Sequence, residues 1–227
     1  MPNVSVIGYT AARSVLPAWT PVWVVFFLVI AIGYASGSHA AASLEFGAAI
    51  LVPISAWMAV ATFRGEDPIQ AATHGLHHGN PTGYRFLVSA SAFLASLAVL
   101  PISLLLALLR APRYPHISPL FLIMALLAQV AGAAIGTAIG TWLTRPIIER
   151  ASTGFIVGGV VGISLIAIPN MPPIRLLTDV IIRAPASGTI AAPSGVRVIE
   201  AVLITLGSLI IAAAACWLAG AFARRRI

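Results

Sequence analysis

The order of apolar and polar segments along this chain restricts it to a membrane protein before any single motif is considered. Residues 41–63 form a nearly continuous apolar run, and a sharply polar segment follows at residues 64–84. Apolar character then resumes over residues 85–109 and returns again beyond Pro119. A run of about 20 apolar residues is what a helix needs to cross the hydrocarbon core of a bilayer. The pattern therefore predicts helices that cross lipid and are joined by short segments in water.

The composition excludes a soluble globular fold. Of the 227 residues, 59% are hydrophobic and 8% are charged, and the mean hydropathy is +1.00. Soluble domains carry about a quarter charged residues, so this chain has too few polar side chains to face water on all sides. The net charge of +7 would suit nucleic acid. In so apolar a chain, however, we expect the arginines to set the orientation in the membrane, and we expect no nucleic-acid partner.

We expect an all-α polytopic fold that forms one transmembrane domain over residues 1–227, with about six spans. The expected spans cover residues 20–37, 42–63, 85–109, 118–143, 152–168 and 196–219. Three further helices are expected outside the lipid core. They are an N-terminal interfacial helix within residues 1–18, a short helix in the polar loop, and an amphipathic, membrane-hugging outer helix over residues 174–193.

The distribution of arginine predicts the topology. With the N-terminus inside, eight arginines lie on the inner side and five on the outer side of the thirteen in the chain. The inner ones are Arg13, Arg64, Arg85, Arg145, Arg150, Arg224, Arg225 and Arg226, and the outer ones are Arg110, Arg113, Arg175, Arg183 and Arg197. The positive-inside rule then places both termini and both polar loops in the cytoplasm.

The polar loop after the second span carries the clearest local signals. Asp67 followed by Pro68 is a helix start, because Asp caps the first free amides and Pro suits the first helical position. His74, His77 and His78 follow the HxxHH spacing of membrane di-iron desaturases and hydroxylases, and imidazole is a suitable ligand for iron. That chemistry needs ligands from several such motifs, whereas the chain has five histidines in all. A solvated loop face is favoured, and a metal-dependent membrane enzyme is kept as an alternative.

Small residues in the fourth span predict a helix contact. Gly132, Gly136 and Gly140 are spaced four apart, which places them on one face and allows another helix to approach closely. The contact is either packing within the chain or a subunit interface. Cys216 stands alone in an apolar run, where it is expected to pack as a small hydrophobe. The sequence offers no Ser/His/Asp set and no phosphate-binding loop, so we expect no catalytic residue, cofactor or metal on this chain.

By its layout, the chain resembles the membrane (permease) subunit of a type-2 ABC exporter. The points of likeness are an interfacial N-terminal helix before six spans, the polar insert from Arg64 to Gly83, the Gly65-Glu66 pair before its helix, and the outer segment from Ile174 to Pro193. The resemblance implies a chain without ATPase activity, in the bacterial cytoplasmic membrane. It also implies ABC ATPase subunits that bind ATP and Mg²⁺, a second permease copy or paralogue, and a hydrophobic or amphipathic small molecule, lipid or peptide as the exported substrate.

The same resemblance implies roles for specific residues. The short helix of the polar loop would be a coupling helix that docks into the ATPase through Glu66, Asp67, Gln70, His74, His77 and His78. Arg145 and Glu149 in the second polar loop would make a secondary contact. A stand-alone secondary transporter is the remaining alternative. That class often contains inverted repeats, and none is evident between residues 1–110 and 111–227.

Overall fold

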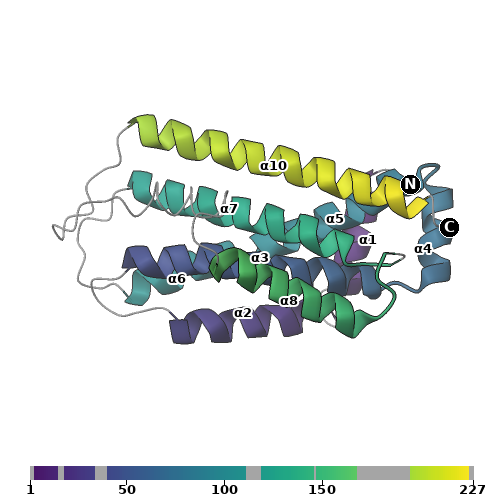
Figure 1. Ribbon diagram of the computed structural model, residues 1–227, viewed down its shortest axis with the longest axis horizontal. Coiled ribbons are helices and arrows are strands. Elements are labelled where there is room, and N and C mark those ends of the chain that lie inside the picture. The colour runs from purple at the N-terminus through teal and green to yellow at the C-terminus, as the bar shows by residue number, and fades with distance from the viewer. Residues whose placement is uncertain are drawn as a thin grey trace.

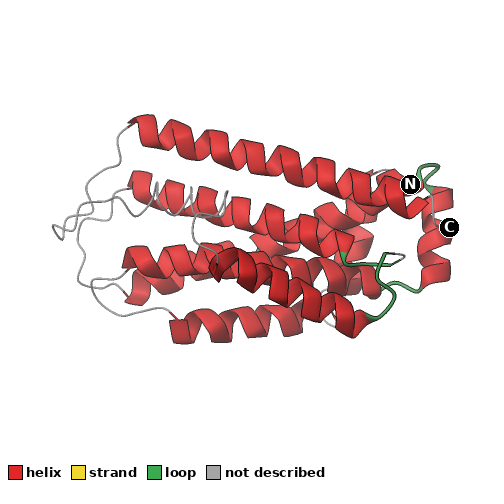
Figure 2. Ribbon diagram, in the orientation of Figure 1, coloured by secondary structure: helices red, strands yellow, loops and turns green. Residues whose placement is uncertain are grey.

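The computed structural model describes residues 3–14, 18–33, 40–110, 119–145, 147–167 and 195–224, and all regular structure in these ranges is helical (Figure 2). The expected all-α class is therefore confirmed for this part of the chain. The helices are α1 (Asn3–Ser14), α2 (Thr20–Gly33), α3 (Ala40–Arg64), α4 (Pro68–His77), α5 (Pro81–Leu97), α6 (Leu100–Arg110), α7 (Pro119–Trp142), α8 (Ala151–Ala167) and α10 (Gly195–Arg224). The outer helix expected over residues 174–193 lies outside the described residues.

Four stretches are long and apolar enough to cross a membrane. They are Phe46–Arg64, Pro81–Leu106, Leu122–Trp142 and Val198–Arg224, and they overlap four of the six expected spans. The other two expected spans correspond to the shorter apolar helices α2 and α8. At 1.5 Å per residue, a helix of the length of α2 reaches only about 21 Å, less than the roughly 30 Å of a hydrocarbon core. The described helices are thus compatible with a multi-pass membrane protein, and the count of six spans stays a prediction.

The third expected span is divided by a turn. The sequence predicts one helix over residues 85–109, whereas the structure ends α5 at Leu97 and begins α6 at Leu100. Backbone hydrogen bonds persist on both sides of the turn, from Ala98 N to Leu94 O at 3.1 Å and from Ser103 N to Val99 O at 3.0 Å. Pro101 explains the division, because proline has no N–H to donate to the carbonyl four residues earlier.

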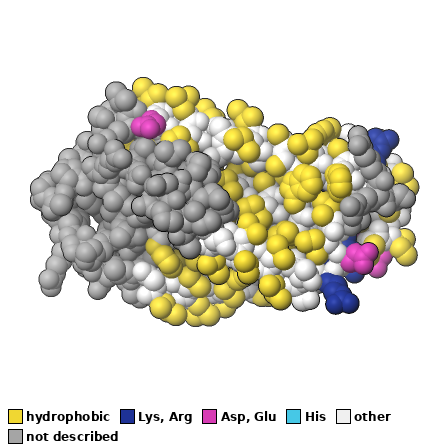
Figure 3. Space-filling model, in the orientation of Figure 1, with side chains coloured by type: hydrophobic (Ala, Val, Ile, Leu, Met, Phe, Trp, Pro, Cys, Tyr) yellow, Lys and Arg dark blue, Asp and Glu magenta, His cyan; other side chains and the backbone are white. Residues whose placement is uncertain are grey.

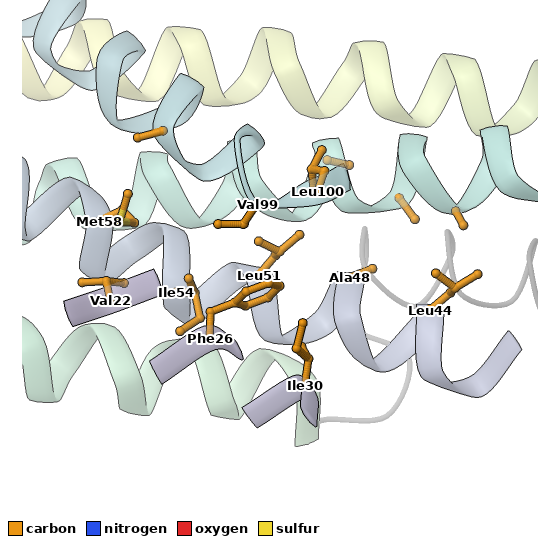
Figure 4. Close-up of a cluster of buried hydrophobic side chains, with 14 of the residues drawn as sticks. Val22, Phe26, Ile30, Leu44, Ala48, Leu51, Ile54, Met58, Val99 and Leu100 are labelled. Carbon is orange, nitrogen blue, oxygen red and sulfur yellow. The ribbon is translucent and has the colours of Figure 1, made fainter. Parts of the chain in front are cut away.

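Helix α3 is the central element of the bundle and contributes more buried hydrophobic residues to the core than any other described helix (Figure 1). Its buried side chains run along its length and meet those of α2 and the α5–α6 turn, as Figure 4 shows. Phe26 of α2 and Leu51 and Met58 of α3 have no exposed surface. A helix that is apolar on every side, as α3 is, can be buried by neighbours all round.

The closest contact in the bundle is between α3 and α7. Gly132, Gly136 and Gly140 of α7 lie against the backbone of α3 at Ala48, Val52 and Ala56, respectively. A Cβ atom at Gly132 would lie 2.6 Å from the carbonyl oxygen of Ala48, and at the other two glycines it would lie closer still to a carbonyl. The structure therefore gives the glycine face a partner within the chain, which is one of the two alternatives that the sequence left open.

Among the described residues, most charged side chains lie at one end of the molecule, and Glu200 near the start of α10 lies at the other. Helix α4, the C-terminal end of α10 and the loop between α7 and α8 lie at the same end in Figure 1. Figure 3 shows arginine and acidic side chains at that end, while the middle of the visible face is hydrophobic or uncharged. Many large apolar side chains of α10 are exposed, including Ile210 (69%) and Ile211 (71%). These properties are expected of a bundle whose middle faces lipid.

Candidate functional site

The polar loop after α3 is a capped helix held between two long ones. The carboxylate of Asp67 accepts a hydrogen bond from Ile69 N at 2.8 Å, and Pro68 is the first residue of α4, as the sequence predicts. The helix ends at His77, and Gly79 then adopts a φ of +74°, which favours glycine. Asn80 accepts from Gly83 N at 3.0 Å and caps α5. The link between α4 and α5 is therefore short and fixed at both ends.

Figure 1 shows α4 lying across the end of the bundle, beyond the ends of the long helices. One buried carboxylate attaches it there. Glu66, which directly precedes the cap, has a side chain that is only 4% exposed. Its Oε1 lies 2.7 Å from His74 Nδ1 and 3.2 Å from Arg13 Nη1. The hydroxyl of Tyr84 lies 2.9 Å from both carboxylate oxygens and donates to them.

We call Tyr9, Arg13, Glu66, His74 and Tyr84 the Glu66 cluster. Beyond the bonds to the carboxylate, the ring of Tyr9 meets that of His74 edge-on at 5.3 Å, and the Arg13 guanidinium lies 5.3 Å from the centroid of the Tyr9 ring. The cluster thereby joins α1, α4 and α5 to the end of α3. A buried carboxylate that is surrounded by donors holds elements in place, because breaking any one bond leaves a desolvated charge under-satisfied.

This finding changes the role of two predicted residues. Glu66 and His74 were expected to contact a partner, but the structure directs both side chains toward the inside of the chain. The reason is that α4 turns a face toward the bundle. His74, Gly75 and His78 lie on that inner face, where a Cβ at Gly75 would meet Pro81 Cα at 3.4 Å.

The outer face of α4 is exposed and partly apolar. Ile69 is 78% exposed and Leu76 is 73% exposed. Because these two residues are seven positions apart in the helix, which is about two turns, they lie on the same side of it. Asp67, Gln70 and His77 are also exposed and surround this pair. Large exposed apolar side chains on a short polar helix are typical of a surface that another protein covers. Ile69 and Leu76 were not among the predicted contact residues, although their seven-residue spacing is a sequence signal for a shared helix face.

The second polar loop is attached to α3 by one arginine. Arg64, the last residue of α3, donates from Nη1 to the carbonyl of Glu149 and from Nη2 to that of Ile148, both at 2.9 Å. Arg145 Nε donates to the same Glu149 carbonyl at 3.2 Å. The side chains of Arg145 and Glu149 are exposed at the surface. The two predicted secondary contacts therefore lie at the α4 end, on a loop that Arg64 fixes to the bundle.

A second partly buried arginine, Arg85, joins α5 to the turn that follows α7. Arg85 Nη2 donates to Thr144 Oγ1 at 2.9 Å, and its guanidinium lies 4.7 Å from the centroid of the Phe63 ring. Sequence reasoning gave Arg64 and Arg85 only a role in topology. The missed signal was their position, since each is the arginine at the junction of a span with the polar loop.

The histidines of the loop do not converge on a common point. His74 contacts Glu66, His77 is exposed, and the His78 ring lies 6.5 Å from that of Tyr84. Within the described ranges, no group of three His, Cys, Asp or Glu side chains is placed to hold a metal ion. Two further histidines, His39 and His116, fall outside those ranges. Cys216 is buried in α10, 3.6 Å from Thr141 Oγ1.

Comparison with known proteins gives no family for this chain. No protein-family model matches it, and neither a curated protein nor a solved structure is significantly similar to it.

Proposed function

We propose that this chain is the permease subunit of an ATP-driven transporter that resembles the type-2 ABC exporters, with α4 as the helix that docks into a separate ATPase. One observation carries the proposal. Helix α4 has an inner face bound to three other helices by the Glu66 cluster and an outer face that exposes Ile69 and Leu76. An element that transmits movement must be rigid toward its own protein and must offer a partner something to bind.

The exposed face has the properties of a docking surface. Ile69 and Leu76 would insert into an apolar groove of the partner, while Asp67, Gln70 and His77 would form the polar rim. Glu66 and His74 would then act from inside, by fixing the angle of α4, rather than by touching the ATPase. Arg145 and Glu149 lie at the same end and would form the secondary contact.

The remaining parts of the proposal rest on the resemblance to type-2 ABC exporters and on the distribution of arginine along the sequence. The α4 end would be cytoplasmic, with both chain termini on that side of a bacterial inner membrane, and the spans would number six. ATP and Mg²⁺ would bind the partner ATPase, and two permease copies or paralogues would enclose the path of a hydrophobic or amphipathic substrate. The apolar character of the bundle supports a substrate of that kind.

Photocrosslinking tests the docking surface directly. A benzophenone amino acid in place of Leu76 should form an adduct with an ABC ATPase in the native membrane, and the purified adduct should hydrolyse ATP with Mg²⁺. The double variant Ile69→Asp/Leu76→Asp should abolish co-purification of the ATPase. Leu120→Asp is the control, because Leu120 is an exposed leucine (39%) at the start of α7. The start of α7 lies at the end of the bundle away from α4. Full co-purification with the double variant, or an adduct with no ATP-binding protein, refutes the proposal.

A further inference from the structure

A pocket of about 590 Å³ opens at the α4 end of the bundle, between α2, α3 and α8. Its walls change character along α3. Arg13, Ser14 and Arg64 line one part of it, and Val25, Trp57 and Phe155 line another. Trp57 is seven residues before Arg64 on the same helix, so the polar and apolar parts are separated by roughly 10 Å along the helix axis. A pocket of this size holds a molecule of some tens of atoms.

The polar part carries one positive charge, that of Arg64, which forms no ion pair among the described residues. Arg13 faces Glu66, whereas both hydrogen bonds of Arg64 go to the carbonyls of Ile148 and Glu149. Within the described ranges, Arg64 forms no ion pair, and the exposed carboxylate of Glu149 forms none. Arg145 adds a further positive charge beside Arg64. An anion at this position would lie beside the Arg64 guanidinium, which no carboxylate of the described residues pairs, whereas the Arg13 guanidinium is already paired with Glu66.

Hydrogen-bond donors are also left unused in the pocket wall. Ser14 is 1% exposed, and its hydroxyl has no partner among the described residues. The Nε atoms of Arg13 and Arg64 are also buried and have no hydrogen-bond partner among the described residues. Buried polar atoms are almost always hydrogen-bonded in proteins, to the protein itself or to something bound to it. Three such atoms lie beside the pocket with almost no exposed surface, and each would have to rotate toward it to donate to an acceptor such as a phosphate group.

The apolar part is built to hold a hydrocarbon chain. The indole N–H of Trp57 donates to the carbonyl of Phe155 at 2.9 Å, which uses its one polar group and leaves the ring face to the pocket. Val25, on the α2 side, is 39% exposed. Trp57 belongs to the stretch Phe46–Arg64, which is long and apolar enough to cross a membrane, and Val25 and Phe155 belong to the shorter apolar helices α2 and α8. The pocket therefore runs from the depth of headgroups toward the depth of acyl chains.

We propose that this pocket binds an anionic phospholipid, with the phosphate near Arg64 and Ser14 and one acyl chain between Val25, Trp57 and Phe155. Charge complementarity and the polarity gradient carry the assignment. The site lies on this chain alone and requires no ATPase, so it is independent of the proposed transport function. A bound lipid would bridge α2, α3 and α8, because each contributes a wall.

The test compares two lipids with identical acyl chains. Purified protein is titrated in detergent with dioleoyl phosphatidylglycerol or dioleoyl phosphatidylcholine, and the dissociation constant of the first bound lipid is measured by native mass spectrometry. Phosphatidylglycerol should bind about tenfold more tightly, and Arg64→Gln should remove about that factor, the value of one charge-assisted contact. Arg224→Gln, an exposed arginine on α10 outside the pocket, should leave it unchanged.

The acyl-chain part is tested separately from the headgroup part. Val25→Trp should fill the apolar wall and weaken phosphatidylglycerol binding at least tenfold. Val24→Trp, at a neighbouring residue of α2 that is 50% exposed and does not line the pocket, is the matched control. Equal binding by the two tryptophan variants, or equal affinity of the wild type for both lipids, overturns the proposal. Displacement of the lipid by millimolar glycerol 3-phosphate also overturns it, because the site would then bind a soluble anion.

Discussion

Substitution of Gly136 by alanine should destabilise the bundle, although alanine is ordinarily the better helix former. The added Cβ would lie against the carbonyl oxygen of Val52 and 2.9 Å from Ser55 Cβ. Neither atom belongs to a flexible side chain, so α3 and α7 would have to move apart. Overpacking of this kind costs about 1–3 kcal/mol, and the helix propensity of alanine returns up to about 1 kcal/mol. We expect a net loss of about 1–2 kcal/mol.

Gly207 provides the matched control for this substitution. It lies in α10, and a Cβ there would meet nothing within 4 Å. Gly207→Ala should therefore be neutral, or stabilising by up to about 1 kcal/mol. Both variants are compared with the wild type by titration from mild detergent into sodium dodecyl sulfate, with loss of helical structure or tryptophan fluorescence as the signal.

The reasoning is refuted if Gly136→Ala unfolds at the same denaturant fraction as Gly207→Ala. The same samples also separate the two alternatives for the glycine face. Contact within the chain predicts that stability falls while the oligomeric state, measured by size-exclusion chromatography with light scattering, stays the same. A change of oligomeric state without loss of stability would instead favour a subunit interface.

Two further substitutions test the α4 end. Glu66→Gln keeps the shape of the side chain but leaves Arg13 without a counter-charge, so the backbone amides of α4 should exchange hydrogen at least tenfold faster, which corresponds to a local loss of about 1.4–3 kcal/mol. Glu149→Gln, at an exposed residue without an ion pair among the described residues, should leave that exchange unchanged. Trp57→Phe removes the hydrogen bond to Phe155 and should lower the free energy of unfolding by about 0.5–1.5 kcal/mol. Trp217→Phe, at an exposed tryptophan, should change the free energy of unfolding by no more than about 0.5 kcal/mol. Equal free energies of unfolding for the two tryptophan variants would contradict a stabilising role for the Trp57 hydrogen bond.

The sequence was sufficient where a local pattern determines the structure. Asp67-Pro68 begins α4 as predicted, because capping depends on residues within one turn. The glycines of α7 were recognised from their spacing for the same kind of reason. The equivalent series in α8 was overlooked, although Gly154 and Gly162 also lie against neighbouring segments, at Leu143 and Pro53.

Sequence reasoning failed where the outcome depends on distant parts of the chain. Nothing local in residues 64–70 indicates that Glu66 is buried, since its partners Arg13 and Tyr84 lie far before and after it. A charged residue next to a helix cap was therefore assigned to the surface. Pro101 lies inside the span expected over residues 85–109, but the turn before it was not expected within a single span. The length of the apolar run alone cannot show that interruption.

The turn before Pro101 divides one apparent span into two helices, α5 and α6. Helix α5 is bound to the α4 end through Tyr84, whereas α6 begins again three residues after α5 ends. A helix bends most easily where its ladder of backbone hydrogen bonds is interrupted. Displacement of α4 would therefore tilt α5 about this joint and leave α6 in place. A movement that starts on one side of the bilayer would then stop partway across the bilayer.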